Sequence, residues 1–130
     1  MRLTTTTFTV GILFLLLTWP HTSRAITNHA PHRLHAAANR TNPPRRGTQA
    51  KRAWIICQIF PRNKCHDAIN VAYCESRLNP RAHNGQYQGI FQLGSSERIR
   101  YGHGRSAWKQ TKAARAYHRH AGWQPWACKP

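Results

Sequence analysis

The sequence predicts a small α+β domain that is mainly helical, with a minor β element and two disulfide bonds. Apolar side chains recur at helical spacing in two separate segments, and an Asn-Gly pair between them marks a tight turn. All four cysteines lie in the segment 53–130. The chain has 130 residues, which accommodate one small domain.

Residues 1–25 have the pattern of a secretory signal peptide. Arg2 supplies a positive charge, residues 10–19 form an apolar run, and Ala25 ends the segment with a small side chain. The apolar run is shorter than the roughly 20 residues that a membrane-spanning helix needs. We therefore expect cleavage after Ala25 and export of the mature chain, with an uncleaved membrane anchor as the alternative.

The next segment, 26–52, is rich in Ala, Asn, Pro, His and Arg and shows no hydrophobic periodicity. Such a composition is typical of a chain that cannot bury a core. We expect a disordered basic linker here, which serves as a solvated tether or contacts a polyanion. The folded domain is expected at 53–130.

Apolar residues at helical spacing predict the first helix of this domain, at 65–77. We expect Asn63 to cap its start and Pro80 to end it. Cys65 and Cys74 would lie about 13 Å apart on this helix, too far for a disulfide. Two of the three pairings of four cysteines therefore remain open. The cysteine spacing does not fit a zinc site, and we expect no metal or cofactor.

Glu75 is one of only three acidic residues in the chain, and it lies inside the apolar arc of this helix. It also lies in the last turn, where the helix dipole disfavours a carboxylate. Both surroundings favour the protonated acid, which can donate a proton to a leaving group. The alternative is a structural ion pair with an arginine such as Arg77 or Arg81.

The segment after this helix contains the minor β element. Asn84 and Gly85 form a tight-turn signal, and residues 86–92 fit a short strand or turn that folds back toward the helix end. This arrangement would place Gln92 opposite Glu75. A short helix follows, which Ser95 or Ser96 would cap, with Glu97 in its first turn.

The last helix is predicted at 107–121, with Ser106 as its N-cap and Gly122 just beyond its end. One of its faces carries a basic stripe, and another face is small and apolar around Tyr117. His118 and His120 point to different faces, so they do not form a metal pair.

The stretch "CESRLNP" (74–80) followed by "NGQYQGIFQLG" (84–94) resembles the lysozyme-like domains of bacterial cell-wall lytic enzymes. Soluble lytic transglycosylases combine an E-S-x-x-N-P helix end with a G-[LI]-x-Q motif, found here as "ESRLNP" and "GIFQ". Resuscitation-promoting factors are similar in another respect. They place a cysteine directly before the catalytic Glu and another after a C-terminal Trp, as Cys74 and "WQPWAC" (123–128) do here. The resemblance covers nearly all of 57–128.

This resemblance implies a role for each matched residue. Glu75 would be the general acid, and then the base, at the β-1,4 bond between N-acetylmuramic acid and N-acetylglucosamine. The closing helix of the transglycosylases, which "AARAYHRH" (113–120) resembles, brings a tyrosine to the active site. The residues implied in sugar binding are Gln92, Tyr87, Gly89 and Tyr117. Core packing of the two tyrosines and a simple chain reversal at Gly89 are the alternatives. The same resemblance favours the disulfide Cys74–Cys128 and leaves Cys57–Cys65 as the other.

One departure from the family leaves the product chemistry open. The transglycosylase motif A-Y-N-A-G has no counterpart, and residues 94–108 stand in its place. Hydrolytic glycosidases usually need two carboxyls. Asp67 lies about 12 Å along the same helix from Glu75 and is turned away, so Glu97 is the better second carboxyl. Because one carboxyl suffices for transglycosylation, we expect a lytic transglycosylase, with a hydrolytic muramidase using Glu97 as the alternative.

The charge of the chain predicts an anionic partner. The formal net charge is +17, and 53–130 alone carries 12 basic and 3 acidic residues. We expect a secreted monomer that acts on peptidoglycan glycan strands and contacts anionic cell-wall polymers. Nucleic acid is a rival partner, but the expected export and disulfide bonds of this protein argue against it. A cationic wall-binding module without catalysis is the remaining alternative.

Overall fold

The computed structural model describes residues 29–130, so the predicted signal peptide lies outside the described residues. The elements are α1 (His32–Ala38), α2 (Gln49–Ile59), α3 (Arg62–Ser76), β1 (His83–Asn84), β2 (Tyr87–Gln88), α4 (Ser95–Arg100) and α5 (Ala107–Ala121). The two strands pair antiparallel, with His83 opposite Gln88 and Asn84 opposite Tyr87. The mainly helical α+β fold with a minor β element is thereby confirmed.

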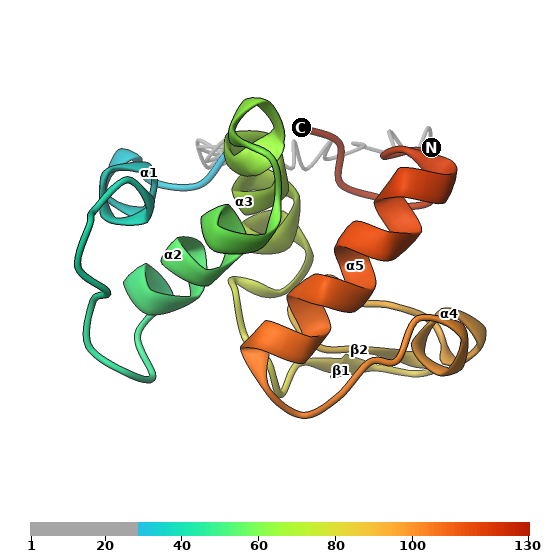
Figure 1. The fold of residues 1–130 in the computed structure, drawn as a ribbon. Coiled ribbons are helices and arrows are strands. Elements are labelled where there is room, and N and C mark those ends of the chain that lie inside the picture. The colour runs from blue at the N-terminus through green and yellow to red at the C-terminus, as the bar shows by residue number, and fades with distance from the viewer. Residues whose placement is uncertain (1–28) are drawn as a thin grey trace, which may run out of the picture.

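The helices pack around α2 and α3. Both α1 and α3 pack on α2, α2 packs on α5, and α5 also contacts α4. Figure 1 shows α1, α2 and α3 grouped on one side of the molecule, with α4 and the hairpin on the other and α5 running between them. This arrangement brings the end of α3, the hairpin, α4 and α5 to one face.

The hydrophobic core forms where α2, α3, α5 and the turn after β2 meet. The largest fully buried side chains include Phe91, Ile56 and Ile69. Burial of each such side chain contributes about 1.5–3 kcal/mol to the free energy of unfolding. Phe91 stacks on Phe60, with ring centroids 5.8 Å apart, and contacts Trp126 edge-on. The aromatic side chains therefore join the core to the C-terminal segment.

The prediction of a disordered linker at 26–52 is wrong for its described part. Helix α1 lies within it, and Leu34 and Ala38 are buried in the core. Trp54 of α2 donates a hydrogen bond to the carbonyl of Arg40 at 3.1 Å, which holds the connection to α1. Thr48 caps α2 by accepting from the amide of Lys51. A helix of seven residues with one large apolar side chain shows almost no periodicity, which is why the sequence pattern missed it.

Helix α3 starts earlier than predicted and ends in a sharp reversal. Pro61 occupies its N-cap position, so Asn63 is not the cap. Arg77 and Leu78 both adopt left-handed conformations, with φ of 55° and 60°. That conformation costs a residue with a side chain about 1–2 kcal/mol. Complete burial of Leu78 offsets the cost, and the chain turns back immediately after Glu75.

Both predicted disulfides are confirmed. Cys57–Cys65 joins α2 to α3, and Cys74–Cys128 joins the end of α3 to the C-terminal segment. Disulfides are compatible with an extracellular location. Among residues 29–130, no helix has the length and apolar character needed to cross a membrane.

The last two helices largely match their predictions. Helix α5 spans the predicted residues, and the Ser106 side chain accepts from the amide of Lys109 at its start. Helix α4 also forms, with Glu97 in its first turn. Gly94 occupies the N-cap position of α4, so neither Ser95 nor Ser96 caps it, contrary to the prediction.

His118 on α5 lies in surroundings that disfavour its charged form. Its ring lies 4.1 Å from that of Trp123 and 5.8 Å from that of Phe60, between centroids. Burial lowers the pKa of His118 below its usual 6.5, the positive charge of Lys64 lowers it further, and Asp67 partly opposes the shift. Burial also lowers the pKa of two other histidines, His35 and His103.

We expect the protein to lose stability as the pH falls through about 6.5, because the unfolded chain takes up protons that the folded histidines exclude. The melting temperature should be lower at about pH 5 than at about pH 7.5. His118→Gln should make this dependence shallower, whereas His120→Gln, at an exposed position of the same helix, should leave it unchanged. Thermal unfolding, followed by circular dichroism at several pH values, gives the dependence of the melting temperature on pH for each variant. The same dependence in the two variants would contradict the assignment to His118.

Candidate active site

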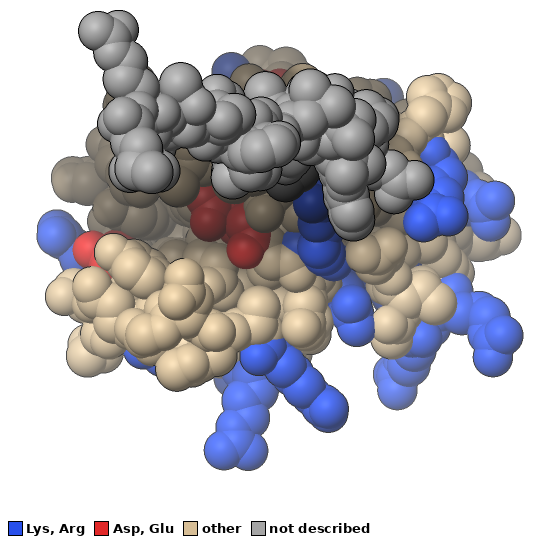
Figure 2. Space-filling view, turned by 180° about the vertical axis from the view of Figure 1, so that it is seen from behind, with Lys and Arg blue, Asp and Glu red and all other residues tan. Residues whose placement is uncertain are grey.

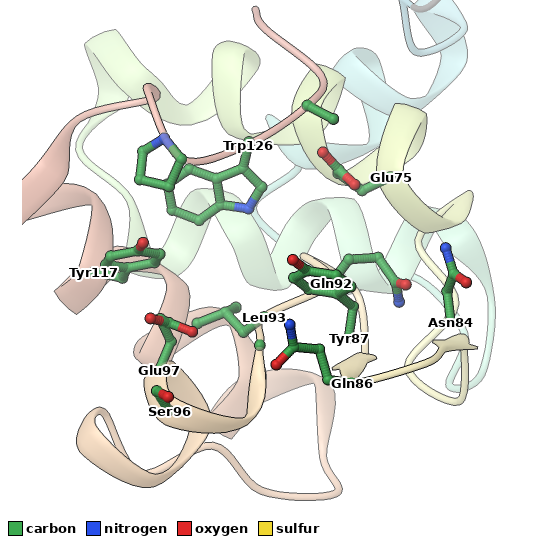
Figure 3. Close-up of a pocket in the computed structure, with 13 residues that line it drawn as sticks. Glu75, Asn84, Gln86, Tyr87, Gln92, Leu93, Ser96, Glu97, Tyr117 and Trp126 are labelled. Carbon is green, nitrogen blue, oxygen red and sulfur yellow. The ribbon is translucent and has the colours of Figure 1, made fainter.

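A cavity of about 540 Å³ opens between the end of α3, the hairpin, α4, α5 and the C-terminal segment (Figure 3). Four of the five residues predicted for catalysis or sugar binding line it, and so does the alternative second carboxyl. These residues are Glu75, Tyr87, Gln92, Tyr117 and Glu97. They come from five separate elements or turns, so the fold assembles the site from distant parts of the chain.

Glu75 lies at the end of α3 with its carboxyl group half-buried in the wall of the cavity. Its Oε1 accepts a hydrogen bond from the backbone amide of Cys128 at 3.0 Å. The disulfide between Cys74 and Cys128 holds these two neighbouring segments together. Within residues 29–130, Lys64 and Asp67 form an ion pair, whereas Glu75 forms no ion pair. The structural alternative for Glu75, an ion pair with a nearby arginine, is therefore not found in this part of the chain.

Ser76 connects the end of α3 to the turn that carries Gln92. Its hydroxyl donates to the carbonyl of Ile90 at 2.7 Å. Gln92 itself is left-handed, with φ of 46°, and its side-chain amide donates to the carbonyl of Gly89 at 2.9 Å. Strained conformations of this kind persist where the surrounding structure fixes them. Figure 3 shows the resulting placement of Gln92 across from Glu75, as the sequence predicts.

Gly89 does not line this cavity, so the prediction that its backbone forms part of the groove is corrected. Its φ is +83°, and a Cβ there would lie 2.7 Å from side-chain atoms of Gln110 and His103. A glycine is needed for this tight approach and for the positive φ. Gly89 therefore reverses the chain behind the hairpin, and it contributes to the site only by positioning Gln92.

Glu97 and Tyr117 form the wall opposite Glu75 (Figure 3). The Tyr117 ring packs against Trp126 and Tyr101, with centroids 5.2 Å and 5.3 Å away. Burial raises the pKa of the Tyr117 phenol above its usual value, and the negative charge of Glu97 adds to the shift. The phenol therefore stays protonated near neutral pH and can donate a hydrogen bond to a ligand.

Several residues that line the cavity were not predicted from the sequence, and Trp126 is the largest of them. Trp126 is 5% exposed, donates from Nε1 to the carbonyl of Phe91 at 2.8 Å, and presents its remaining surface to the cavity. Its position beside Cys128 was the available signal, because the disulfide brings that segment to Glu75. Asn84 was also missed, although it pairs with Tyr87 and shares its face of the hairpin.

The charge of the cavity is opposite to that of the rest of the protein. Two of the three acidic residues in the chain line it, and none of its lining residues within 29–130 is Lys or Arg. Figure 2 shows acidic atoms in a hollow on this face and Lys and Arg side chains around it. The remaining walls consist mainly of side-chain amides, hydroxyls and aromatic rings. Such a lining suits a polar, uncharged ligand together with acid–base chemistry.

Residues 29–130 contain no group of three His, Cys, Asp or Glu side chains positioned to hold a metal ion. Comparison of the chain with protein-family models, curated proteins and solved structures found no match. A functional assignment therefore depends on the residues of the cavity and their geometry.

Proposed function

We propose that this protein cleaves the β-1,4 glycosidic bond between N-acetylmuramic acid and N-acetylglucosamine in peptidoglycan, with Glu75 as general acid and then base. The observation that carries the proposal is the placement of Glu75. Its carboxyl group has no ion-pair partner among the described residues and lies in an open cavity walled by amides and aromatic rings. The resemblance of "ESRLNP" and "GIFQ" to the lytic transglycosylases supports the same chemistry.

In the proposed reaction, Glu75 donates its proton to the glycosidic oxygen while the bond to C1 of the muramic ring breaks. The ring then carries oxocarbenium character. The Glu75 carboxylate next removes the proton from the C6 hydroxyl of the same sugar, whose oxygen bonds to C1 and closes a 1,6-anhydro ring. The amide hydrogen bond from Cys128 orients the carboxyl group for both steps.

The other lining residues have roles in sugar binding under this proposal. The Gln92 side chain keeps its carbonyl oxygen as an acceptor, since its amide nitrogen already donates to the turn. Tyr117 contributes a hydroxyl donor, and Tyr87, which is 46% exposed, provides an aromatic face at the rim. The volume of about 540 Å³ is within the usual range for small-ligand sites.

A hydrolytic muramidase is the second candidate, because the cavity contains a second carboxyl group. Glu97 faces Glu75 from the opposite wall (Figure 3). In a hydrolase, Glu97 would activate a water molecule or stabilise the oxocarbenium ion. By contrast, the cavity is a poor site for nucleic acid, because the described residues line it with two acidic side chains and with no Lys or Arg.

Digestion of purified peptidoglycan followed by mass analysis of the soluble fragments tests the proposal. Fragments with 1,6-anhydromuramic ends would confirm transglycosylation, whereas reducing muramic ends would identify hydrolysis. No soluble fragments from the folded protein would contradict both and favour a binding module.

Glu97→Gln separates the two chemistries. Because transglycosylation needs one carboxyl, we expect this variant to keep most of its activity and its anhydro products. Asp67→Asn provides a control for the change in net charge outside the cavity. A loss of at least about 100-fold in Glu97→Gln, but not in Asp67→Asn, would identify Glu97 as a catalytic group of a hydrolase.

A further inference from the structure

A second cavity, of about 690 Å³, lies on the other face of the hairpin. His83 and Gln88, which are cross-strand partners, line this second cavity. Asn84 and Tyr87, the neighbouring pair, line the cavity that contains Glu75. Because successive residues of a strand point to opposite faces, the hairpin is a partition between the two cavities.

The second cavity is positively charged. Three arginines and two histidines line it, with no Asp or Glu. These residues are Arg81, Arg98, Arg105, His83 and His103. The ion pair found within 29–130 lies elsewhere, between Lys64 and Asp67, so no carboxylate neutralises these arginines in the described structure. The two cavities thus have opposite charge on the two sides of one hairpin.

One arginine of this cavity is fixed, and two are available to a ligand. Arg98 donates to the Gln88 side chain at 2.6 Å, which holds α4 against the hairpin. Arg81 and Arg105 are exposed, and within 29–130 only their backbone atoms make hydrogen bonds, to the side chains of Asn79 and Gln110. Their guanidinium groups therefore have donors in the fork geometry that matches an oxyanion.

Hydrogen bonds hold one of the residues that line this cavity in place. The buried Gln110 side chain accepts from the amide of Ile90 at 3.0 Å and donates to the carbonyl of Pro80 at 2.9 Å. These bonds tie α5 to both ends of the hairpin region. The two exposed arginines therefore border a concave site with one wall already fixed, so that ligand binding has to order only their side chains.

We propose that this second cavity binds a phosphate group. A free phosphate offers more acceptor oxygens and more negative charge than a carboxylate, and a phosphodiester polymer presents a charged phosphate in every repeat, so either matches the exposed Arg81 and Arg105 better than a single carboxylate does. The group can be a free phosphate or a phosphodiester within a polymer. Within the described part of the chain, no aromatic ring of Phe, Tyr or Trp lines this cavity, so these residues offer no platform on which nucleic-acid bases stack. A polyol phosphate polymer fits this lining better than single-stranded nucleic acid does.

Calorimetric titration of the full chain with inorganic phosphate, poly(glycerol phosphate) and acetate tests this assignment. We expect saturable binding of phosphate that is tighter than that of acetate. The double variant Arg81→Gln/Arg105→Gln should weaken phosphate binding at least about 10-fold, because two charged donors are lost. The control, Lys112→Gln/Arg119→Gln, removes the same charge from exposed positions of α5 outside the cavity and should change the affinity less than about 2-fold.

Three results would overturn the assignment to phosphate: no saturable binding, acetate binding as tight as phosphate binding, or equal weakening in both double variants. Binding of inorganic phosphate alone would assign the site to free phosphate, and binding of poly(glycerol phosphate) as well would assign it to a polymer. Tighter binding of single-stranded DNA than of poly(glycerol phosphate) would overturn the preference for a polyol polymer. None of these measurements involves glycan cleavage, so their failure leaves the proposed enzyme unaffected.

Discussion

Glu75→Gln is expected to reduce the release of soluble fragments from purified peptidoglycan at least about 100-fold, with the fold intact. The Gln side chain has the same shape, and its carbonyl oxygen can still accept the hydrogen bond from the Cys128 amide. It lacks the proton that the glycosidic oxygen must receive. The expected loss therefore reflects chemistry and leaves the shape of the cavity unchanged.

Two further measurements make this result decisive. Asp67→Asn removes the same charge from the same helix, at a partly exposed side chain that pairs with Lys64 at 3.8 Å, and should keep most of the activity. Sedimentation of each variant with insoluble peptidoglycan measures binding separately from cleavage, and we expect Glu75→Gln to remain bound. Full cleavage activity in Glu75→Gln would reject the catalytic role and leave a cationic wall-binding module as the better interpretation.

Removal of the Cys74–Cys128 disulfide by a double substitution to Ser is expected to have the largest effect on stability. This bond closes a sequence separation of 54 residues. In the loop-entropy model its loss lowers the free energy of unfolding by about 4 kcal/mol. Activity should fall further than the folded fraction, because the C-terminal segment supplies both the Cys128 amide and the wall around Trp126. Urea denaturation gives the stability, and cleavage assays at low urea give the activity of the folded protein.

The second disulfide provides the matched control. Cys57–Cys65 closes a separation of only 8 residues. The same model predicts that its removal lowers the free energy of unfolding by about 2.5 kcal/mol. Neither cysteine lines the cavity. We therefore expect Cys57→Ser/Cys65→Ser to be less destabilised and to keep the specific activity of its folded fraction. If the two double variants lost specific activity equally, the tether at Cys128 would have no special role in the site.

Long, capped helices and local turns could be predicted from the sequence. Helix α5 has clear periodicity and residues suited to both of its ends, so its bounds were predicted correctly. Helix α1 is short and depends on packing against α2, which a local pattern does not reveal. The cap of α4 was missed because serine is preferred over glycine at an N-cap, whereas here Gly94 leaves room for the Glu97 carboxylate against the backbone.

The part of the candidate site that could be predicted is the part where two motifs follow each other closely in the sequence with a turn between them. Glu75 and Gln92 lie on either side of the predicted turn at Asn84 and Gly85, so their meeting across the cavity followed from the chain folding back toward the helix end. Trp126 was not predictable in the same way, because an aromatic residue in the sequence is equally consistent with a place in the core and a place in the wall of a cavity. The sequence alone could not show that Glu75 lacks an arginine partner within 29–130, because Arg77 and Arg81 are close to it in the sequence.

The hairpin between the two cavities has a consequence for insertions and deletions. Its register places Asn84 and Tyr87 toward one cavity and His83 and Gln88 toward the other. A shift of one residue in a strand exchanges every side chain between its two faces. One residue inserted into β1 would therefore turn His83 toward the carboxyl groups, and one inserted into β2 would turn Tyr87 toward the arginines. Point substitutions on either face, by contrast, can change one cavity while the other keeps its lining.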